Sequence, residues 1–182
     1  GDWELDIPQT IRRTVHNGGE IELEFVRERV NRIHLVLLLD SGGSMEPYAQ
    51  MVEQFFTAFS EAKGFKSFQA WHFHNVPYGK LYNSDGQESM LTLLQQWTPQ
   101  HRVVWVGDAC MAPYELMAPT YFSNMRGLDW IVRVQEKCPK SVWLNPESQQ
   151  YWNHPTIRSI GETVPMYPLT LDGLSQAVQQ MR

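Results

Sequence analysis

The segment from residue 33 to residue 43 constrains the fold of this chain more than any other. Ile33 to Leu39 is apolar apart from His34, and Asp40-Ser41-Gly42-Gly43 follows directly. Seven residues of this kind, ended by a turn sequence, are typical of a buried central strand in a parallel sheet. Helices cover both faces of such a strand, so the rest of the chain should alternate strands with helices.

The remaining sequence shows this alternation. Apolar runs and turn residues predict strands at 21–25, 33–39, 65–74, 101–107, 141–144 and 164–169, with 78–82 returning from 65–74 as a hairpin. Helical spacing of apolar residues predicts helices at 48–63, 90–97, 128–137 and 171–181. We therefore expect an α/β fold with an open, doubly wound, mainly parallel sheet flanked by helices. A lead-in segment, residues 1–32, should contribute one edge strand and pack on the domain formed by residues 33–182.

Composition excludes several classes of protein. The chain has 182 residues, of which 42% are hydrophobic and 19% charged, so it is neither disordered nor a coiled coil. Its net charge of −5 provides no basic field for nucleic acid, and its longest apolar run is too short to span a membrane. With two cysteines and no signal-peptide pattern at the start, we expect a cytoplasmic setting.

Two predicted strands end in an aspartate, at Asp40 and Asp108. Ligands of doubly wound sheets bind beyond the carboxyl ends of the strands. The glycines after Asp40 permit a sharp turn, which would bring Asp40 and Ser44 toward one point. Such an oxygen-rich pocket suits Mg²⁺ or Mn²⁺, with Asp108 as a second carboxylate. The alternative is structural: Asp40 forms the turn and Ser44 caps a helix.

Five residues near the predicted strand ends are candidate contacts for the metal or for a partner, namely Ser41, Gly42, Gly43, His74 and Asn75. His72 and His74 are two residues apart on one strand, so their side chains share a face. A transition-metal site would need a third ligand, for example His101. We favour the alternative that these histidines line the crevice.

The segment after Asp108 supplies three more candidates. Met111, Tyr114 and Glu115 should rim the metal loop, with an exposed Met and Tyr forming a contact patch for a protein. The alternative is that Pro113 only begins a helix.

Catalytic motifs are not convincing. Cys110 would need a neighbouring base, such as His72 or His74, to act as a nucleophile. Ser44 lacks the Gly-x-Ser-x-Gly pattern, and no Gly-x-x-x-x-Gly-Lys phosphate loop occurs in the sequence. We expect no enzyme activity. The competing hypothesis is a magnesium-dependent hydrolase that uses Asp40 and Asp108.

Four segments together resemble one family. Asp40-Ser41-Gly42-Gly43-Ser44-Met45 resembles the metal-ion-dependent adhesion site of von Willebrand factor A (VWA) domains. The segments 14–23, 142–146 and 167–174 resemble the CoxE-like bacterial branch of that family. The resemblance covers about residues 7 to 182 and implies a VWA fold.

The resemblance also implies a set of ligands. Asp40 and Ser44 match the first and last positions of the metal loop, and Asp108 matches the later aspartate. Gly42 stands where the family has its middle serine. The usual Gly-Gly-Thr motif is not visible between Tyr82 and Trp97, which leaves Ser84, Asp85 or Thr98 as possible substitutes. A metal could therefore bind weakly, bind only when a partner completes the site, or be absent.

The implied function is protein docking. An aspartate or glutamate of a partner would fill the open position on the metal. The resemblance implies that the partner is a MoxR-type AAA+ ATPase and that the pair matures or remodels a client protein complex. It also implies a helical region before the domain. The alternatives are the hydrolase and a degenerate, metal-free scaffold.

Overall fold

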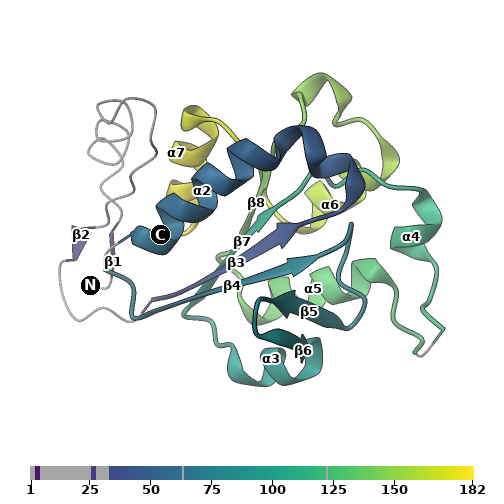
Figure 1. Ribbon diagram of the computed structural model, residues 1–182, viewed down its shortest axis with the longest axis horizontal. Helices are drawn as coiled ribbons and strands as arrows, with labels where there is room; N and C mark the ends of the chain where they lie inside the picture. Colours follow the sequence, from purple (N-terminus) through teal and green to yellow (C-terminus); the bar gives the residue numbers. More distant parts are fainter. Residues whose placement is uncertain (1–2, 5–25, 28–32, 63, 122) are drawn as a thin grey trace.

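The computed structural model describes residues 3–4, 26–27, 33–62, 64–121 and 123–182 (Figure 1). Strands β1 (Trp3–Glu4) and β2 (Val26–Arg27) pair with each other in a small antiparallel sheet. The strand predicted at 21–25 lies outside the described residues, as does most of the lead-in segment.

A seven-stranded sheet forms the centre of the domain, with the order β6-β5-β4-β3-β7-β8-β9. Parallel pairing joins β3 to β4, β3 to β7, β7 to β8 and β8 to β9, while β4–β5 and β5–β6 are antiparallel. The expected α/β class and the mainly parallel sheet are confirmed. The strands span β3 (His34–Asp40), β4 (Ser67–Phe73), β5 (Lys80–Asn83), β6 (Gly86–Ser89), β7 (His101–Val106), β8 (Val142–Asn145) and β9 (Met166–Pro168).

Helices cover both faces of this sheet. In Figure 1, α2 and α7 lie above the sheet, and α3 and α5 lie below it. Buried residues of α4 and α6 belong to the same core layer as those of α3 and α5. The helices span α2 (Ala49–Glu61), α3 (Met90–Gln96), α4 (Pro113–Met117), α5 (Gly127–Lys137), α6 (Pro155–Thr163) and α7 (Leu171–Gln180), with 3-10 turns η1 (Gly43–Tyr48) and η2 (Gln149–Tyr151). No helix among these described residues is long and apolar enough to cross a membrane.

The central strand shows why its sequence is continuously apolar. Val36 and Leu38 are buried on the side of α3 and α5, whereas Leu35, Leu37 and Leu39 are buried on the side of α2 and α7. Successive side chains of a strand point to opposite faces, so covering both faces requires an apolar residue at nearly every position.

Aromatic rings fill the layer beneath the carboxyl ends of the strands. Trp105 of β7 and Trp143 of β8 are paired in register and stack with ring centroids 5.1 Å apart. Phe73 of β4 packs edge-on against Trp105 at 5.5 Å. All three side chains are at most 1% exposed. The strand ends that carry the candidate site therefore rest on a rigid, close-packed floor.

Candidate functional site

Asp40 and Asp108 meet at the carboxyl ends of β3 and β7. Asp40 is the last residue of β3, and Asp108 comes two residues after β7 ends. A Cβ atom on Gly107 would lie 2.9 Å from the Cβ of Asp40, so only glycine permits this approach. Both carboxylates are buried, at 4% and 3% exposure. The strand-end rule thus located two buried acidic groups that are close enough for the charge of Asp108 to act on Asp40.

The two oxygens of the Asp40 carboxylate have different surroundings. Oδ1 accepts hydrogen bonds from the backbone N–H groups of Gly42, at 2.8 Å, and Asn75, at 3.0 Å. Oδ2 is buried and has no hydrogen-bond partner among the described residues. Burial raises the pKa of Asp40, and the charge of Asp108 adds to this, while the two N–H donors oppose it. Buried polar atoms are rarely left unpaired, so Oδ2 is a position where a cation fits.

Asp108 closes a similar turn, since its Oδ1 accepts from the N–H of Cys110 at 3.1 Å. The strand behind it holds this loop in place. Trp143 donates its indole N–H to the carbonyl of Gly107 at 2.8 Å, and the Asn145 amide donates to the carbonyl of Asp108 at 3.0 Å. Asn145 was not among the predicted site residues. It is a fully buried polar residue at the end of β8, so the rule that found Asp40 could also have found it.

The start of α6 fixes the same loop from a second direction. The hydroxyl of Thr156 donates to the carbonyl of Ala109 at 2.8 Å and accepts from the N–H of Met111 at 3.2 Å. Thr156 is 1% exposed. Ala109 itself has a left-handed backbone, with φ of 57°. A non-glycine residue in this conformation is held there by its surroundings, and Thr156 supplies part of that restraint.

Asn75 and Glu115 are brought together at the edge of the site. Asn75 follows β4 with a left-handed backbone, φ 61°, which asparagine tolerates better than most residues. Its side-chain Nδ2 donates to Glu115 Oε1 at 3.0 Å. The other oxygen of Glu115, Oε2, accepts from the N–H of Ala112 at 3.0 Å. Two of the predicted contact residues therefore form a bridge between the loop after β4 and helix α4.

The three-histidine metal site, which the sequence analysis did not favour, does not form, and His72 lines the groove beside Asp40, as the favoured interpretation expects. Ser41 turns toward β4, where its Oγ is hydrogen-bonded to Nδ1 of His72 at 2.7 Å. Burial lowers the pKa of His72, which favours its neutral form. His74 is exposed just beyond β4, and His101 lies at the opposite end of the sheet, in register with His34. The three-histidine metal site is therefore wrong, because parallel register separates strand starts from strand ends.

Ser44 lies in η1 with its side chain exposed, and its hydroxyl has no hydrogen-bond partner in the described part of the chain. The residue before η1 is Gly42, and no side chain caps the turn. The capping alternative for Ser44 is therefore wrong. Gly43 is exposed, and a Cβ there would meet nothing within 4 Å.

The segment after Asp108 differs in part from expectation. Met111 is only 6% exposed and packs into the core, so the predicted exposed methionine is wrong. Its N–H bond to Thr156 draws the loop inward at this point. Tyr114 is 71% exposed, as expected, and Met117 on the same short helix is 42% exposed. The exposed surface near the site is therefore made by α4 itself.

None of the substitutes for the absent threonine motif lies at the metal loop. Thr98 contacts His101 at the start of β7, with its N–H 3.0 Å and its Oγ1 3.1 Å from the imidazole Nδ1. Ser84 and Asp85 form the turn between β5 and β6. An oxygen ligand that replaces this threonine near Asp40 therefore has to come from a residue other than Ser84, Asp85 and Thr98.

The donors that do lie at the strand ends are carboxylate and hydroxyl oxygens, which suit a hard cation such as Mg²⁺. The described residues contain no group of three His, Cys, Asp or Glu side chains able to hold a metal. Cys110 is half-buried, and burial raises the pKa of its thiol, as does the nearby Asp108. This disfavours the reactive thiolate. The site is thus better suited to an oxygen-coordinated cation than to thiol chemistry.

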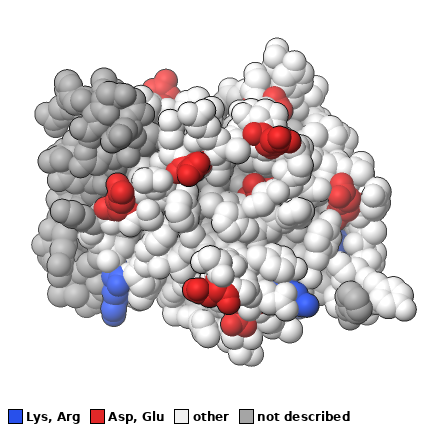
Figure 2. Space-filling model, in the orientation of Figure 1, with Lys and Arg blue, Asp and Glu red and all other residues white. Residues whose placement is uncertain are grey.

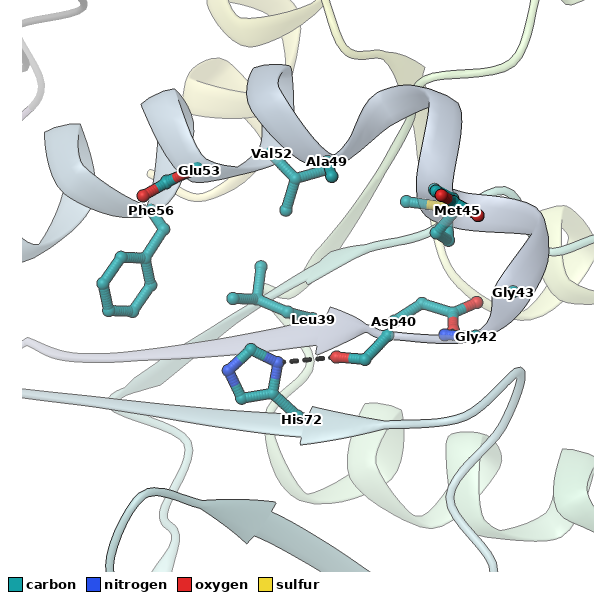
Figure 3. Close-up of a pocket in the computed structure, with 12 residues that line it drawn as sticks. Leu39, Asp40, Gly42, Gly43, Met45, Ala49, Val52, Glu53, Phe56 and His72 are labelled. Atoms are coloured by element: carbon teal, nitrogen blue, oxygen red, sulfur yellow. Dashed lines mark hydrogen bonds between the residues drawn. The ribbon is translucent and has the colours of Figure 1, made fainter.

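A groove adjoins the metal loop between β3, β4 and α2 (Figure 3). Its volume is about 490 Å³. Figure 3 shows Val52 and Phe56 of α2 pointing toward Leu39 of β3, with His72 at the lower edge. The lining residues are Leu39, Asp40, Ser41, Gly42, Gly43, Met45, Glu46, Ala49, Val52, Glu53, Phe56 and His72.

Comparison with protein families agrees with this architecture. Residues 2–76 match the family described as VWA domain containing CoxE-like protein. The matched stretch includes β3, the turn after Asp40, β4 and Asn75. Comparison with curated proteins found no match. The family match over residues 2–76 and the mainly parallel sheet that carries Asp40 at its centre make this chain similar to VWA domain proteins of the CoxE-like family.

Proposed function

We propose that this domain docks a protein partner through a divalent cation held by Asp40, Ser44 and Asp108. The observation that carries the proposal is the buried, unpartnered Oδ2 of Asp40 beside a second buried carboxylate. A cation such as Mg²⁺ supplies, when bound, an open position that an oxygen from another molecule can fill. Affinity would then depend on a single aspartate or glutamate of the partner.

The charge of the molecule favours dependence on the metal. The chain carries a net charge of −5. Figure 2 shows Asp and Glu side chains spread over the face that includes α2, with few Lys and Arg side chains. Such a surface repels an acidic partner, and a bound cation would make the electrostatic potential near Asp40 positive. Docking of an acid at this face therefore requires the metal.

The partner we propose is a MoxR-type AAA+ ATPase acting with this domain on a client protein complex. Support comes from the resemblance to the CoxE-like branch, and the sequence has no phosphate-binding loop of its own. The exposed Tyr114 on α4 provides an aromatic contact next to the loop. We place the pair in the cytoplasm.

Two measurements test the proposal. Calorimetric titration of metal-free protein with Mg²⁺ and Mn²⁺ should show binding that Asp40→Ala abolishes and that Asp85→Ala, in the exposed β5–β6 turn, leaves unchanged. A purified MoxR-type ATPase from the same organism should then bind in Mg²⁺ and be released by EDTA. If Asp40→Ala binds the cation as the unaltered protein does, the metal loop is wrong. If EDTA leaves the ATPase bound, docking through the cation is wrong.

A further inference from the structure

The side-chain oxygen of Asn75 lies at the metal loop. A Cβ atom built on Gly42 would lie 2.9 Å from Asn75 Oδ1 and 3.0 Å from Asp40 Oδ1. Both oxygens therefore border the same small space above Gly42. The backbone N–H of Asn75 also donates to the Asp40 carboxylate at 3.0 Å, which ties the two residues together. Oδ1 of Asn75 accepts no hydrogen bond from the described residues.

Glu115 determines which end of the Asn75 amide faces this space. A carboxylate only accepts hydrogen bonds, so the group that meets Glu115 Oε1 at 3.0 Å has to be the NH₂ end. Glu115 is itself held by the N–H of Ala112 on its other oxygen, at 3.0 Å. With the NH₂ end committed to Glu115, the oxygen end is directed toward Gly42 and Asp40.

We propose that Asn75 Oδ1 is a ligand of the divalent cation at Asp40 and that Glu115 is the residue that positions it. The inference rests on the metal site proposed above. An amide oxygen is a hard, neutral donor of the kind that oxygen-binding cations accept. Gly42 contributes no side-chain oxygen, and Asn75 Oδ1 lies beside the position that the Cβ of a side chain at residue 42 would take.

The same geometry makes two donors mutually exclusive. A serine at position 42 would place its Cβ within 3.0 Å of Asn75 Oδ1, closer than real Cβ contacts permit. Either the amide of residue 75 or a side chain at residue 42 fits there. A glycine at position 42 and an asparagine at position 75 are therefore two parts of one arrangement.

Single substitutions test the ligand and its orientation. Asn75→Gly removes the amide but keeps the left-handed backbone and its N–H bond to Asp40, because glycine adopts positive φ freely. We expect Mg²⁺ and Mn²⁺ affinity, measured by calorimetry, to fall roughly 10- to 100-fold. Glu115→Gln should also weaken cation binding. If the oxygen of the substituted side chain keeps the hydrogen bond from the Ala112 N–H, its new NH₂ group faces Asn75. The Asn75 amide then turns its oxygen toward that NH₂ group and away from Asp40. In an Asn75→Gly background, Glu115→Gln should have no further effect.

A double substitution separates a ligand from a merely structural residue. Gly42→Ser alone should weaken cation binding, because it displaces the Asn75 amide. Combined with Asn75→Gly, the serine hydroxyl has room, and affinity should recover relative to either single variant. If Asn75 only supported the fold, the losses of cation affinity in the two single variants would add in the double variant, and affinity would not recover.

The control is Asn153→Gly, which makes the same change at an exposed position. Circular dichroism and thermal midpoints in EDTA verify that each variant is folded. Unaltered affinity in Asn75→Gly, or a double variant no better than Asn75→Gly, overturns the inference while leaving Asp40-dependent binding intact. Absence of any cation binding by the unaltered protein overturns the inference and the metal-dependent function together.

Discussion

Asp40 is the residue where stability and function oppose each other. Its carboxylate is 4% exposed, lies beside Asp108 and keeps one oxygen without a partner. A buried charge that is not fully compensated destabilises the folded state. Without a cation, the protein therefore carries a free-energy penalty at this position, and the cation that we propose would remove it.

Asp40→Asn should accordingly stabilise the metal-free protein. The amide keeps an oxygen for the Gly42 and Asn75 N–H groups and removes the buried charge. We expect the thermal midpoint in EDTA to rise by about 2 °C or more, which corresponds to ~1 kcal/mol in a chain of this size. Added Mg²⁺ should raise the midpoint of the unaltered protein only. A midpoint in EDTA lower than that of the unaltered protein contradicts this account.

Sequence patterns predicted single residues where a local rule applied. Asp40 and Asp108 followed from their positions at the ends of apolar strands. The Asn75–Glu115 bridge joins residues 40 positions apart, and no local pattern reports such a pairing. The expected exposure of Met111 was wrong, because the packing of α6 against the loop decides which way residue 111 faces.

The first turn of α6 holds the loop after Asp108 in place. Thr156 makes hydrogen bonds to Ala109 and Met111, and it has no contact with solvent to replace them. Its removal leaves a buried carbonyl and a buried N–H group unpaired. Each such group costs roughly 1–3 kcal/mol.

Thr156→Val keeps the shape of the side chain and removes the hydroxyl. We expect it to lower the free energy of unfolding by about 2 kcal/mol or more and to weaken cation binding, because the Asp108 loop loses its restraint. Thr163→Val is the matched control in the same helix, since the Thr163 hydroxyl donates a hydrogen bond to the Ser159 carbonyl within that helix and to no other described residue. Urea denaturation and calorimetry measure both effects. Equal stability of the two variants would show that Thr156 does not hold the loop.

Hydrophobic periodicity predicted most of the helices and strands, but it did not reveal every one of them. Helices α2, α3, α5 and α7 and strand β3 lie close to their predicted bounds. The strand predicted at 164–169 is confirmed by β9, which lies at one edge of the sheet. Strand β6 was missed because Gly86-Gln87-Glu88-Ser89 has no apolar alternation. Helix α6 was missed although one of its faces is buried, because it is short, begins at Pro155 and contains Gly161.

Over the whole molecule, the two ends of the sheet carry different chemistry. The carboxyl ends hold the aspartates, and the amino ends of β3 and β7 hold His34 and His101, stacked with ring centroids 4.5 Å apart. Burial lowers the pKa of His101 to about 4, and the proximity of His34 contributes. The pKa of His34 is lowered as well, by burial and by Lys66.

This arrangement predicts sensitivity to acid. The unfolded chain binds a proton at His101 near pH 6.5 while the folded chain resists it until about pH 4. Stability is therefore complete above pH 6.5 and lost as the pH falls toward 4, by up to ~1.4 kcal/mol per pH unit. Urea denaturation at pH 7.5, 6.0 and 5.0 should show a smaller loss in His101→Asn than in the unaltered protein. The exposed His74→Asn is the control, and identical pH dependence of all three proteins would contradict the prediction.

The position of β3 between β4 and β7 has a consequence for folding during synthesis. One edge of β3 pairs with β4, at residues 67–73, and the other edge pairs with β7, at residues 101–106. A nascent chain that has emerged only to residue 76 exposes an unpaired, strongly apolar strand edge. Such edges bind other chains readily. We therefore expect the protein to be most prone to aggregation during synthesis, after β4 has emerged from the ribosome and before β7 emerges.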